Sequence, residues 1–446
     1  MDTRGKSGRD VPLAVDLDGT LVSTDLLWES IFILLKKNIF FAFLLPVWLL
    51  SGKAHLKHEI ARRVTINASV LPYRQDFLDY LRAEHASGRK LVLATASAET
   101  YAQAVASELG IFSAVHASTC TTNLSAHRKA DALSEHYGAR GFDYAGNDCD
   151  DIAVFNAARQ AIVVAPDPAA ARFQKSNGGR LFERNPIAWK TYLKMLRVHQ
   201  WLKNLLVFVP AFLAHDILEP QVLSATFLAF IAFSASASAI YILNDIIDLP
   251  LDRQHVRKRF RPFASGQLSI PFGLAVSAGL LLVAVLICFF LPLPFALAIG
   301  IYLITTTAYS LVIKRMLLVD VICLAALYSL RLLGGHGSGE DTAFLLADGL
   351  CHVLLPVACA GEALCRVAEL HRNGKRSYCW PGLSPGRYRY RRAKRRCLRL
   401  YSRAGSGALY QQRSRAHTLH LSLADLAAGA YRALYQCAGM DFGASW

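Results

Sequence analysis

Apolar residues follow two different patterns along this chain of 446 residues. In the first part, short apolar segments such as residues 11–15 and 90–95 end in polar residues and alternate with helical segments, as strands do in an α/β protein. In the second part, residues 222–243 and 262–313 carry no charged side chain, and apolar runs of about 20 residues can cross a bilayer. We therefore predict a doubly wound α/β domain followed by an all-α polytopic membrane domain.

The domain boundaries are placed where these patterns change. We predict the α/β domain over residues 1–165, with a helical insertion at about residues 25–88, and the membrane domain over residues 191–335. Residues 166–190 contain several Pro, Asn and Gly residues and are interpreted as the linker. Residues 336–446 differ from both domains and are treated separately below.

The membrane domain offers several candidate spans, of which the first is short: residues 203–218, 222–243, 271–291, 294–311 and 317–334. The first residues of the chain lack the apolar core of a signal peptide, so we expect the N-terminal domain to stay in the cytoplasm. The first pair of spans then returns the chain to the cytoplasmic side, where the positively charged loop that follows agrees with the positive-inside rule. We expect an integral protein of the bacterial inner membrane.

The loop after the second span carries three carboxylates, Asp245, Asp248 and Asp252, next to the amide of Asn244. Positions three and four apart share one helix face, where like charges repel unless a ligand compensates. Oxygen ligands suit Mg²⁺, which bridges protein carboxylates and phosphate oxygens. Five Lys and Arg residues within 253–261 would hold the same phosphates. A solvated cytoplasmic loop explains these cations but not the aspartate spacing, so we predict a site for a phosphorylated substrate.

These motifs resemble the UbiA superfamily of intramembrane prenyltransferases. Asn-Asp-x-x-Asp-x-x-x-Asp, followed by Lys-Arg-x-Arg-Pro and Ala-Ser-Gly, is similar to the first aspartate-rich motif of the family. The segment 197–204 is similar to the branch of decaprenyl-phosphate phosphoribosyltransferase, which usually has Pro where Val198 stands. Residues 309–320 and 328–331 resemble the second polar motif, and the resemblance covers roughly residues 190–335.

The resemblance implies Mg²⁺-assisted departure of diphosphate and transfer of the remaining group onto an acceptor. In the similar branch the donor is phosphoribosyl diphosphate and the acceptor a polyprenyl phosphate, whereas the main branch joins a prenyl diphosphate to an aromatic acceptor. Both alternatives stay open, as does a non-catalytic membrane scaffold. The resemblance assigns metal binding to Asn244, Asp245, Asp248 and Asp252, and substrate binding to Lys203, Asn204, Lys258, Arg259, Arg261, Tyr309, Lys314 and Asp320.

The N-terminal domain carries four motifs in the order found in the haloacid dehalogenase superfamily, which it resembles. The first is Asp-Leu-Asp-Gly-Thr directly after the first strand, where the resemblance makes Asp16 the nucleophile and Asp18 the general acid and base. It gives Thr95 and Lys129 the binding of the phosphoryl oxygens. The acidic loop that completes the Mg²⁺ shell contributes Asp148 and Asp151.

Residue 147 of that acidic loop is Asn where Asp is more usual, and an amide is a weaker ligand for Mg²⁺. The resemblance implies a phosphatase, fused to the transferase so that the product of one site lies near the other. The alternative is a domain that has lost its activity and only regulates or scaffolds.

The helical insertion contains a long apolar stretch at residues 31–50, which Lys36 and Lys37 interrupt and Pro46 breaks. We expect a cap that lies in the membrane interface, with its lysines reaching toward the headgroups and Trp48 near them. The alternative is the buried core of a cap. Either placement keeps the phosphatase site close to lipid substrates.

Net charge is +16, and residues 336–446 hold sixteen Lys or Arg and seven Asp or Glu. This segment also holds six of the ten Cys, and its long apolar spans stop. Its basic residues follow no clear helix or strand period, so we predict no nucleic-acid partner. A reading frame shifted by one nucleotide can encode apolar spans here, and we interpret the segment as the product of a frameshift near Gly335 that leaves later membrane helices absent.

Overall fold

The computed structural model describes residues 11–213, 215–311, 327 and 331. The chain divides into two compact units, residues 1–347 and 348–446, and every contact reported below lies within the first. The predicted span 317–334 falls almost entirely outside the described residues, and the predicted frameshifted segment 336–446 falls entirely outside them.

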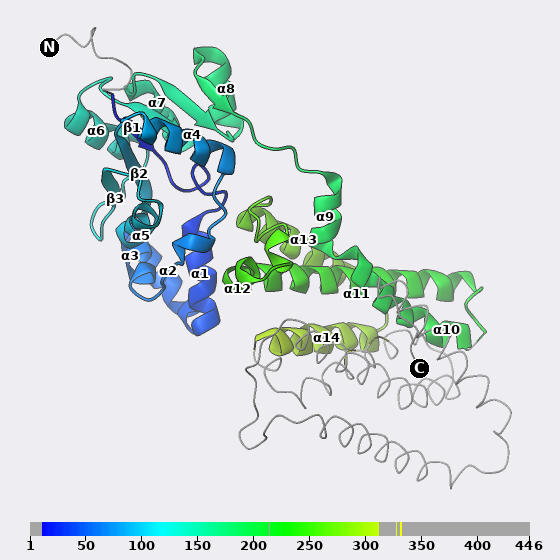
Figure 1. Ribbon diagram of the computed structural model, residues 1–446. Coiled ribbons are helices and arrows are strands. Elements are labelled where there is room, and N and C mark those ends of the chain that lie inside the picture. The colour runs from blue at the N-terminus through cyan, green and yellow to red at the C-terminus, as the bar shows by residue number, and fades with distance from the viewer. Residues whose placement is uncertain (1–10, 214, 312–326, 328–330, 332–446) are drawn as a thin grey trace, which may run out of the picture. The chain divides into compact units, whose positions relative to one another are not determined.

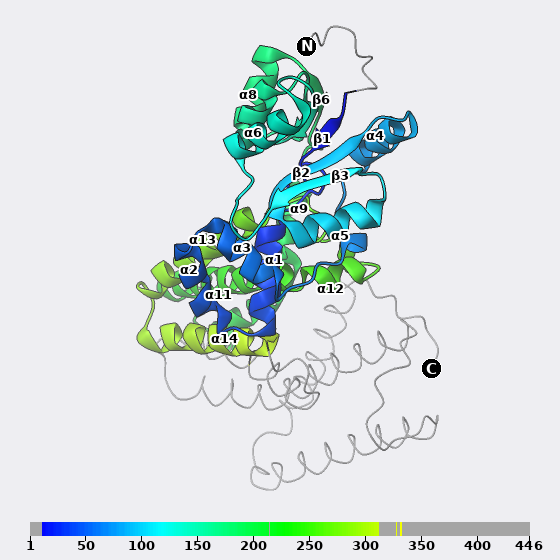
Figure 2. The ribbon, with the colours of Figure 1, turned by 90° about the vertical axis from the view of Figure 1, so that its left-hand side faces the viewer.

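A parallel six-stranded sheet with the order β3-β2-β1-β4-β5-β6 forms the N-terminal domain (Figures 1 and 2). Every neighbouring pair runs parallel, and the chain starts in the middle of the sheet and winds outward to both edges. This topology confirms the predicted doubly wound α/β fold. The strands are β1 (Leu13–Val15), β2 (Leu91–Ala98), β3 (Ala114–Ser118), β4 (Asp143–Gly146), β5 (Ala161–Val164) and β6 (Arg180–Phe182).

Both faces of the sheet are covered, because successive strand residues point to opposite faces. Leu13 and Val15 of β1 belong to the apolar cluster formed with α4 and α5, whereas Ala14 belongs to the cluster formed with α6, α7 and α8. These helices are α4 (Gln75–Ala86), α5 (Glu99–Leu109), α6 (Ala126–Tyr137), α7 (Ile152–Ala157) and α8 (Pro168–Asn177). The two clusters leave the carboxyl ends of the strands at one edge, where a doubly wound sheet places its ligands.

The predicted linker 166–190 is wrong in its first half, because this segment contains α8 and the edge strand β6. The Asp and Pro interpreted as linker residues are a helix start: the Asp167 carboxylate accepts from the amides of Ala169 at 2.9 Å and Ala170 at 2.7 Å, and Pro168 occupies the first turn. The sheet domain therefore extends to Phe182 rather than ending at residue 165.

Three helices form the predicted cap: α1 (Leu26–Lys37), α2 (Phe41–Leu50) and α3 (Lys53–Ala61). The expected break at Pro46 is wrong, because Pro46 lies inside α2 and the chain turns at Asn38, which is extended and accepts from the Phe40 amide at 2.9 Å. Helix α2 leaves Phe43 and Leu50 exposed, which favours the interfacial placement, while Trp48 is buried within the cap.

The helical region begins with α9 (Trp189–Leu196) and contains two helices that are long and apolar enough to cross a membrane, α11 (Pro220–Ile247) and α13 (Ile270–Cys288). They confirm helices at the predicted spans 222–243 and 271–291. Helix α14 (Leu293–Leu311) matches the segment 294–311. Two short elements follow α11, namely α12 (Leu249–Gln254) and the 3-10 turn η4 (Lys258–Phe260).

The predicted first span, residues 203–218, is wrong as a single helix. This segment is a long 3-10 element, η3 (Val198–Phe208), followed by the short α10 (Val209–Leu213). The reason is tertiary: the Trp201 indole donates to the Ser238 hydroxyl at 2.9 Å, and the Asn204 amide donates to the Ser234 hydroxyl at 3.0 Å. Small residues of α11 permit this close approach, as they do between membrane helices.

The extended sheet leads to a test of fragment stability. A soluble fragment of residues 11–187 should be more stable than one of residues 11–165 by on the order of 2–3 kcal/mol, because the shorter fragment loses β6 and the α8 ring of Phe173, which stacks on Phe155. Urea unfolding followed by circular dichroism measures the difference. Equal midpoints for the two fragments would contradict the extended boundary.

Candidate functional site

The first candidate site lies where β1 ends. Asp16 follows β1, and the Lys129 ammonium from α6 donates to its carboxylate at 2.8 Å and to that of Asp151 at 3.2 Å. Lys129 also donates to the Tyr144 hydroxyl at 2.8 Å, and that hydroxyl donates to Asp151 at 2.5 Å. All four side chains are buried. The structure thus gathers two of the predicted carboxylates, those of Asp16 and Asp151, around the predicted cation Lys129.

Asp18 is held by two donors on the other side of the same loop. The backbone amide of Leu26 donates to one carboxylate oxygen at 2.9 Å, and the Ser97 hydroxyl donates to the other at 2.5 Å. The predicted hydroxyl, that of Thr95, is buried and accepts from the Ser97 amide at 3.0 Å. Ser97 lines the site cavity and Thr95 does not. The hydroxyl that faces the site is therefore that of Ser97, two residues after the predicted Thr95.

The acidic loop is ordered by its own hydrogen bonds. Asp148 caps the short turn η2 (Cys149–Asp151), where it accepts from the amides of Asp150 at 2.9 Å and Asp151 at 3.2 Å. The unusual Asn147 accepts from the Thr20 hydroxyl at 3.0 Å. The amide at residue 147 therefore links the acidic loop to the first motif, a role that an amide fills without adding another negative charge.

A cavity of about 140 Å³ joins these groups. The cap contributes Lys57 of α3, which the sequence analysis missed, and its ammonium donates to the Ala96 carbonyl at 2.7 Å and the Asn123 side chain at 3.0 Å. Burial lowers the pKa of Lys57, while Asp18 and Asp25 oppose that shift. The charged residues lining the cavity are Asp16, Asp18, Asp25, Lys57, Lys129, Asp148, Asp150 and Asp151.

Crowding of carboxylates makes this cavity suited to a divalent cation. Burial raises the pKa of Asp16 to about 8, and Asp151 and Asp18 add to the shift while Lys129 opposes it. Burial likewise raises the pKa of Asp18 to about 7 and that of Asp148 to about 6. Within the described residues no group of three or more His, Cys, Asp or Glu is arranged around a single metal position. The oxygen donors nevertheless fit Mg²⁺, which would supply the positive charge that the three shifted carboxylates lack.

A second cluster of carboxylates lies at the end of α11. Arg261 joins two of its members, since its guanidinium contacts Asp245 at 3.1 Å and Asp252 at 2.6 Å. Arg197 also donates to the buried Asp245. Asp248 points elsewhere and contacts the Lys36 ammonium of the cap at 2.5 Å. The structure thus brings Asp245 and Asp252 together through one arginine and pairs Asp248 with the N-terminal domain.

The other predicted substrate residues fall at different places. Asn204 is buried and accepts from the Arg331 guanidinium at 2.8 Å. Asn244 is half-buried, as is Lys203, whereas Lys258 and Arg259 are exposed. The side chain of Tyr309 and the residues Lys314 and Asp320 lie outside what the structure describes.

Several charged residues of this region were missed as site residues. Arg197 and Arg331 stand in the quoted motifs, but their side chains were assigned no role. The pair between Glu29 and Arg253 joins segments 224 positions apart, and no local pattern indicates it. The only sequence signal was that Lys36 and Glu29 are charges on an apolar helix.

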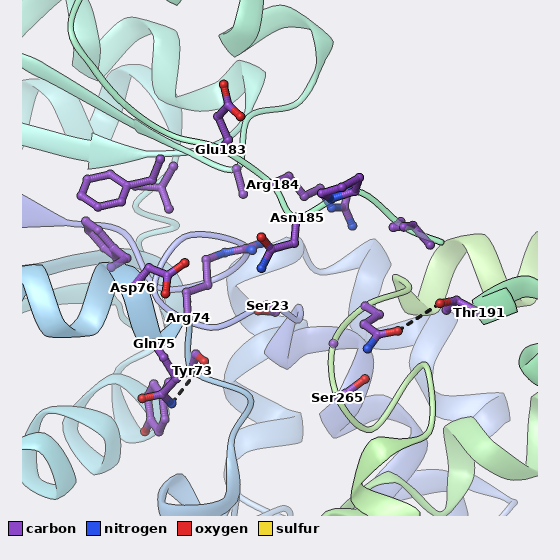
Figure 3. A pocket seen from close by; sticks show the side chains of 18 of the residues that line it. Ser23, Tyr73, Arg74, Gln75, Asp76, Glu183, Arg184, Asn185, Thr191 and Ser265 are labelled. Carbon is purple, nitrogen blue, oxygen red and sulfur yellow. Dashed lines mark hydrogen bonds between the residues drawn. The ribbon is translucent and has the colours of Figure 1, made fainter. Parts of the chain in front are cut away.

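A larger cavity of about 510 Å³ lies between the start of α4, the segment after β6 and the loop before α13 (Figure 3). Arg74, Arg184 and Asn185 line it, and the Thr191 hydroxyl and the Gln267 side chain are 3.3 Å apart at its edge. None of the predicted site residues lines this cavity.

Comparison with known proteins finds a family match for the helical region. Residues 205–360 match the UbiA prenyltransferase family. The chain is 34% identical over 340 residues to the uncharacterized protein y4nM of Sinorhizobium fredii, covering 74% of this chain and 64% of that protein. It is 33% identical over 185 residues to decaprenyl-phosphate phosphoribosyltransferase of Mycobacterium tuberculosis, covering 40% of this chain and 60% of that protein.

Two solved structures are also similar. A haloacid dehalogenase family hydrolase of Salmonella enterica has a TM-score of 0.30, 12% identity, and covers 38% of this chain and 66% of its own. A UbiA homolog of Archaeoglobus fulgidus, bound to DMAPP and Mg²⁺, has a TM-score of 0.30, 22% identity, and covers 38% and 62%. The region 205–360 is therefore similar to the UbiA prenyltransferase family, and the N-terminal domain has a doubly wound parallel sheet.

The chain spans 64% and 60% of the lengths of the two curated relatives. The family match runs past Gly335 to residue 360, into the segment that the sequence analysis interpreted as frameshifted. The frameshift stays a prediction, and the nucleotide sequence downstream of Gly335 is its test: a stop codon within the first dozen or so codons of the alternative frame would contradict it.

The raised pKa values at the first site predict how Mg²⁺ acts on stability. Asp16 has a folded-state pKa of about 8 against 3.8 for the unshifted group, so its contribution to stability is full below pH 3.8 and is lost as pH rises toward 8. Mg²⁺ replaces the proton as counter-charge, so it should raise the thermal midpoint more at pH 8 than at pH 5.

Thermal unfolding with and without Mg²⁺ at both pH values measures this effect. In Asp16→Asn, which titrates no proton at this position, the difference in Mg²⁺ stabilisation between pH 5 and pH 8 should shrink. An equal Mg²⁺ shift at both pH values in the unaltered chain would contradict the assignment.

Proposed function

We propose that this chain transfers a group from a diphosphate donor to a membrane lipid and that its N-terminal domain removes a phosphate from a related ester. The observation that carries the transferase is the pairing of Asp245, Asp248 and Asp252 with cations at the end of an apolar helix. One matched relative is a decaprenyl-phosphate phosphoribosyltransferase. We therefore propose phosphoribosyl diphosphate as the donor and a polyprenyl phosphate as the acceptor.

The aspartates and the arginines have different tasks in this proposal. Asp245, Asp248 and Asp252, with the amide oxygen of Asn244, would hold Mg²⁺, which neutralises the leaving diphosphate when bound. Arg261 already bridges two of these carboxylates. Once the carboxylates turn to the metal, its guanidinium is free to bind phosphate oxygens. The apolar helices α11 and α13 exclude water from the acceptor lipid, and the proposed orientation places the polar loop in the cytoplasm.

The phosphatase part rests on the group around Lys129. The Asp16 carboxylate, kept ionised by Lys129 and bound Mg²⁺, would attack the phosphorus, and Asp18 would give its proton to the leaving oxygen. Lys129 lies 2.8 Å from Asp16 and holds the phosphoryl oxygens as charge builds up on them. Asp148 and Asp16 would hold Mg²⁺. Transfer of a phosphoribosyl group leaves a 5-phosphate on the lipid, which is a fitting ester for the tethered site.

Removal of a single aspartate tests the transferase. Asp245→Ala and Asp248→Ala should each lower transfer from phosphoribosyl diphosphate by about 100-fold or more, because one Mg²⁺ ligand and its share of charge neutralisation are lost. Transfer into the lipid fraction of membranes is measured with labelled donor, beside an assay with labelled prenyl diphosphate. Hydrolysis of small phosphate esters should continue in both variants, and full transfer in either one removes that residue from the site.

Replacement of the nucleophile tests the phosphatase. Asp16→Asn should lower hydrolysis of small phosphate esters at least about 1,000-fold, since an amide is a poor nucleophile. It should also prevent trapping of a phosphorylated aspartate. Asp150→Asn, whose side chain lies at the exposed rim of the acidic loop, is the matched control and should retain most of the hydrolysis. Unchanged hydrolysis by Asp16→Asn rules out this nucleophile.

A further inference from the structure

Helix α1 of the cap turns one face toward the helical region of the chain (Figures 1 and 2). Trp28 and Phe32 of this face pack against the apolar cluster that contains Ile246 and Leu249. Lys36 lies one turn further along the same face, because residues four apart in a helix are neighbours. The contact therefore combines apolar packing with charge.

Glu29 adds a buried ion pair to this contact. Both of its carboxylate oxygens accept from the Arg253 guanidinium, one at 2.8 Å, and the two residues are only 2% and 8% exposed. The third donor of Arg253, its Nε, bonds to the Ala264 carbonyl at 3.0 Å. Arg253 thus ties the two ends of the loop that follows the aspartates, and Glu29 fixes the arginine. A buried bidentate pair of this kind sets geometry strictly, because removing one partner leaves an uncompensated charge.

The loop itself approaches the N-terminal domain closely. Gly266 has a φ of +71°, and a Cβ atom at this position would lie 2.6 Å from the Cβ of Ser23. Only a glycine fits both the backbone conformation and the space. Ser23 lies just beyond the first motif of the phosphatase-like domain, so the loop also approaches that domain closely at Gly266.

Lys36 pairs with an aspartate of the predicted metal site. Its ammonium contacts Asp248 at 2.5 Å and the carbonyl of Ile247 at 3.4 Å. The two charged side chains are 25% and 22% exposed, so the pair is partly shielded from water. A cation that binds Asp248 must compete with this ammonium.

The opposite end of α1 belongs to the first site. The amide of Leu26, its first residue, donates to Asp18 at 2.9 Å, and Asp25 caps the helix. A helix of 12 residues is about 18 Å long, so one rigid element touches both carboxylate clusters.

We propose that α1 is a working part of the transferase site, in which Glu29 positions the aspartate-rich loop through Arg253 and Lys36 is the counter-ion that Mg²⁺ displaces from Asp248. Glu29 and Lys36 are positioning residues that one domain supplies to the other. The role of Lys36 rests on the proposed transferase function, whereas that of Glu29 in the loop does not.

A double-mutant cycle in the full chain, in detergent, tests the role of Glu29. Glu29→Gln and Arg253→Gln should each lower the thermal midpoint, and the double variant should lose much less than the sum of the two losses. If Glu29→Gln alone does not fold, restored folding in the double variant with Arg253→Gln also shows that the two losses are not additive. Glu59→Gln on α3, which among the described residues pairs with Arg62 and Arg63 of the cap, is the matched control and should add independently to Arg253→Gln. Additive losses for Glu29 and Arg253 overturn the positioning role.

Mg²⁺ titration in the presence of inorganic diphosphate tests Lys36 with thermal stability as the readout. Lys36→Met should lower the Mg²⁺ concentration for half-maximal stabilisation by about two- to fivefold, the range expected for losing one partly exposed competing ion pair. Lys37→Met removes the same charge one residue away, where the ammonium bonds to the Arg63 carbonyl within the cap, and should leave the half-maximal concentration unchanged. In an Asp248→Asn background, Lys36→Met should have no effect, which separates this metal site from that of the phosphatase.

The outcomes separate this inference from the proposed function. Equal half-maximal concentrations for Lys36→Met and the unaltered chain overturn the counter-ion role. Stabilisation by Mg²⁺ that is the same with and without Asp248→Asn overturns the transferase metal site and the Lys36 role with it. Even then, non-additive losses in the Glu29 and Arg253 double-mutant cycle still support the positioning of the loop by α1.

Discussion

Buried carboxylates need positive charge, and this requirement organises both clusters of the molecule. A carboxylate taken out of water either finds a cation or takes up a proton. Burial raises the pKa of Asp16 and that of Asp18, and the Lys129 ammonium beside Asp16 and the Lys57 ammonium near Asp18 only partly oppose this. At the end of α11, Asp245 and Asp252 share Arg261, and Asp248 pairs with Lys36. The first cluster is short of positive charge, whereas the second is already balanced.

This difference determines what each site does with a divalent cation. In the proposed mechanism Mg²⁺ would replace protons at the first site, so that its affinity follows pH. At the second site Mg²⁺ would replace side-chain cations. Arg261, which bridges Asp245 and Asp252, and Lys36, which holds Asp248, are the groups released in this way. In the proposed loaded site Arg261 would bind phosphate oxygens, whereas Lys36 is only the counter-ion that Mg²⁺ displaces from Asp248.

Much of the fold could be predicted from sequence because the signals are local. The short apolar run at residues 11–15 and the apolar length of α11 and α13 are visible in short windows. The misses came from features that depend on distant partners. Residues 203–218 are apolar enough for a helix, yet hydrogen bonds from Trp201 and Asn204 to α11 hold much of this stretch as a 3-10 element.

The candidate sites show the same division. The motifs around Asp16 and Asp245 could be named from their spacing, and resemblance to known families gave them roles. The charged partners from other segments could not be found this way, since Lys57 and Glu29 belong to a cap whose packing no motif records. Asp167 and Pro168 were assigned to a linker because the residue types that begin helices are also the ones that form turns.

The central claim is that one chain transfers a phosphorylated sugar to a lipid and then removes its phosphate. The most direct measurement uses phosphoribosyl diphosphate labelled in its 5-phosphate, with membranes that contain the chain, Mg²⁺ and a polyprenyl phosphate. The account predicts that label enters the lipid fraction first and is released from it as inorganic phosphate afterwards. Label that is released as phosphate without ever entering the lipid fraction would contradict the account.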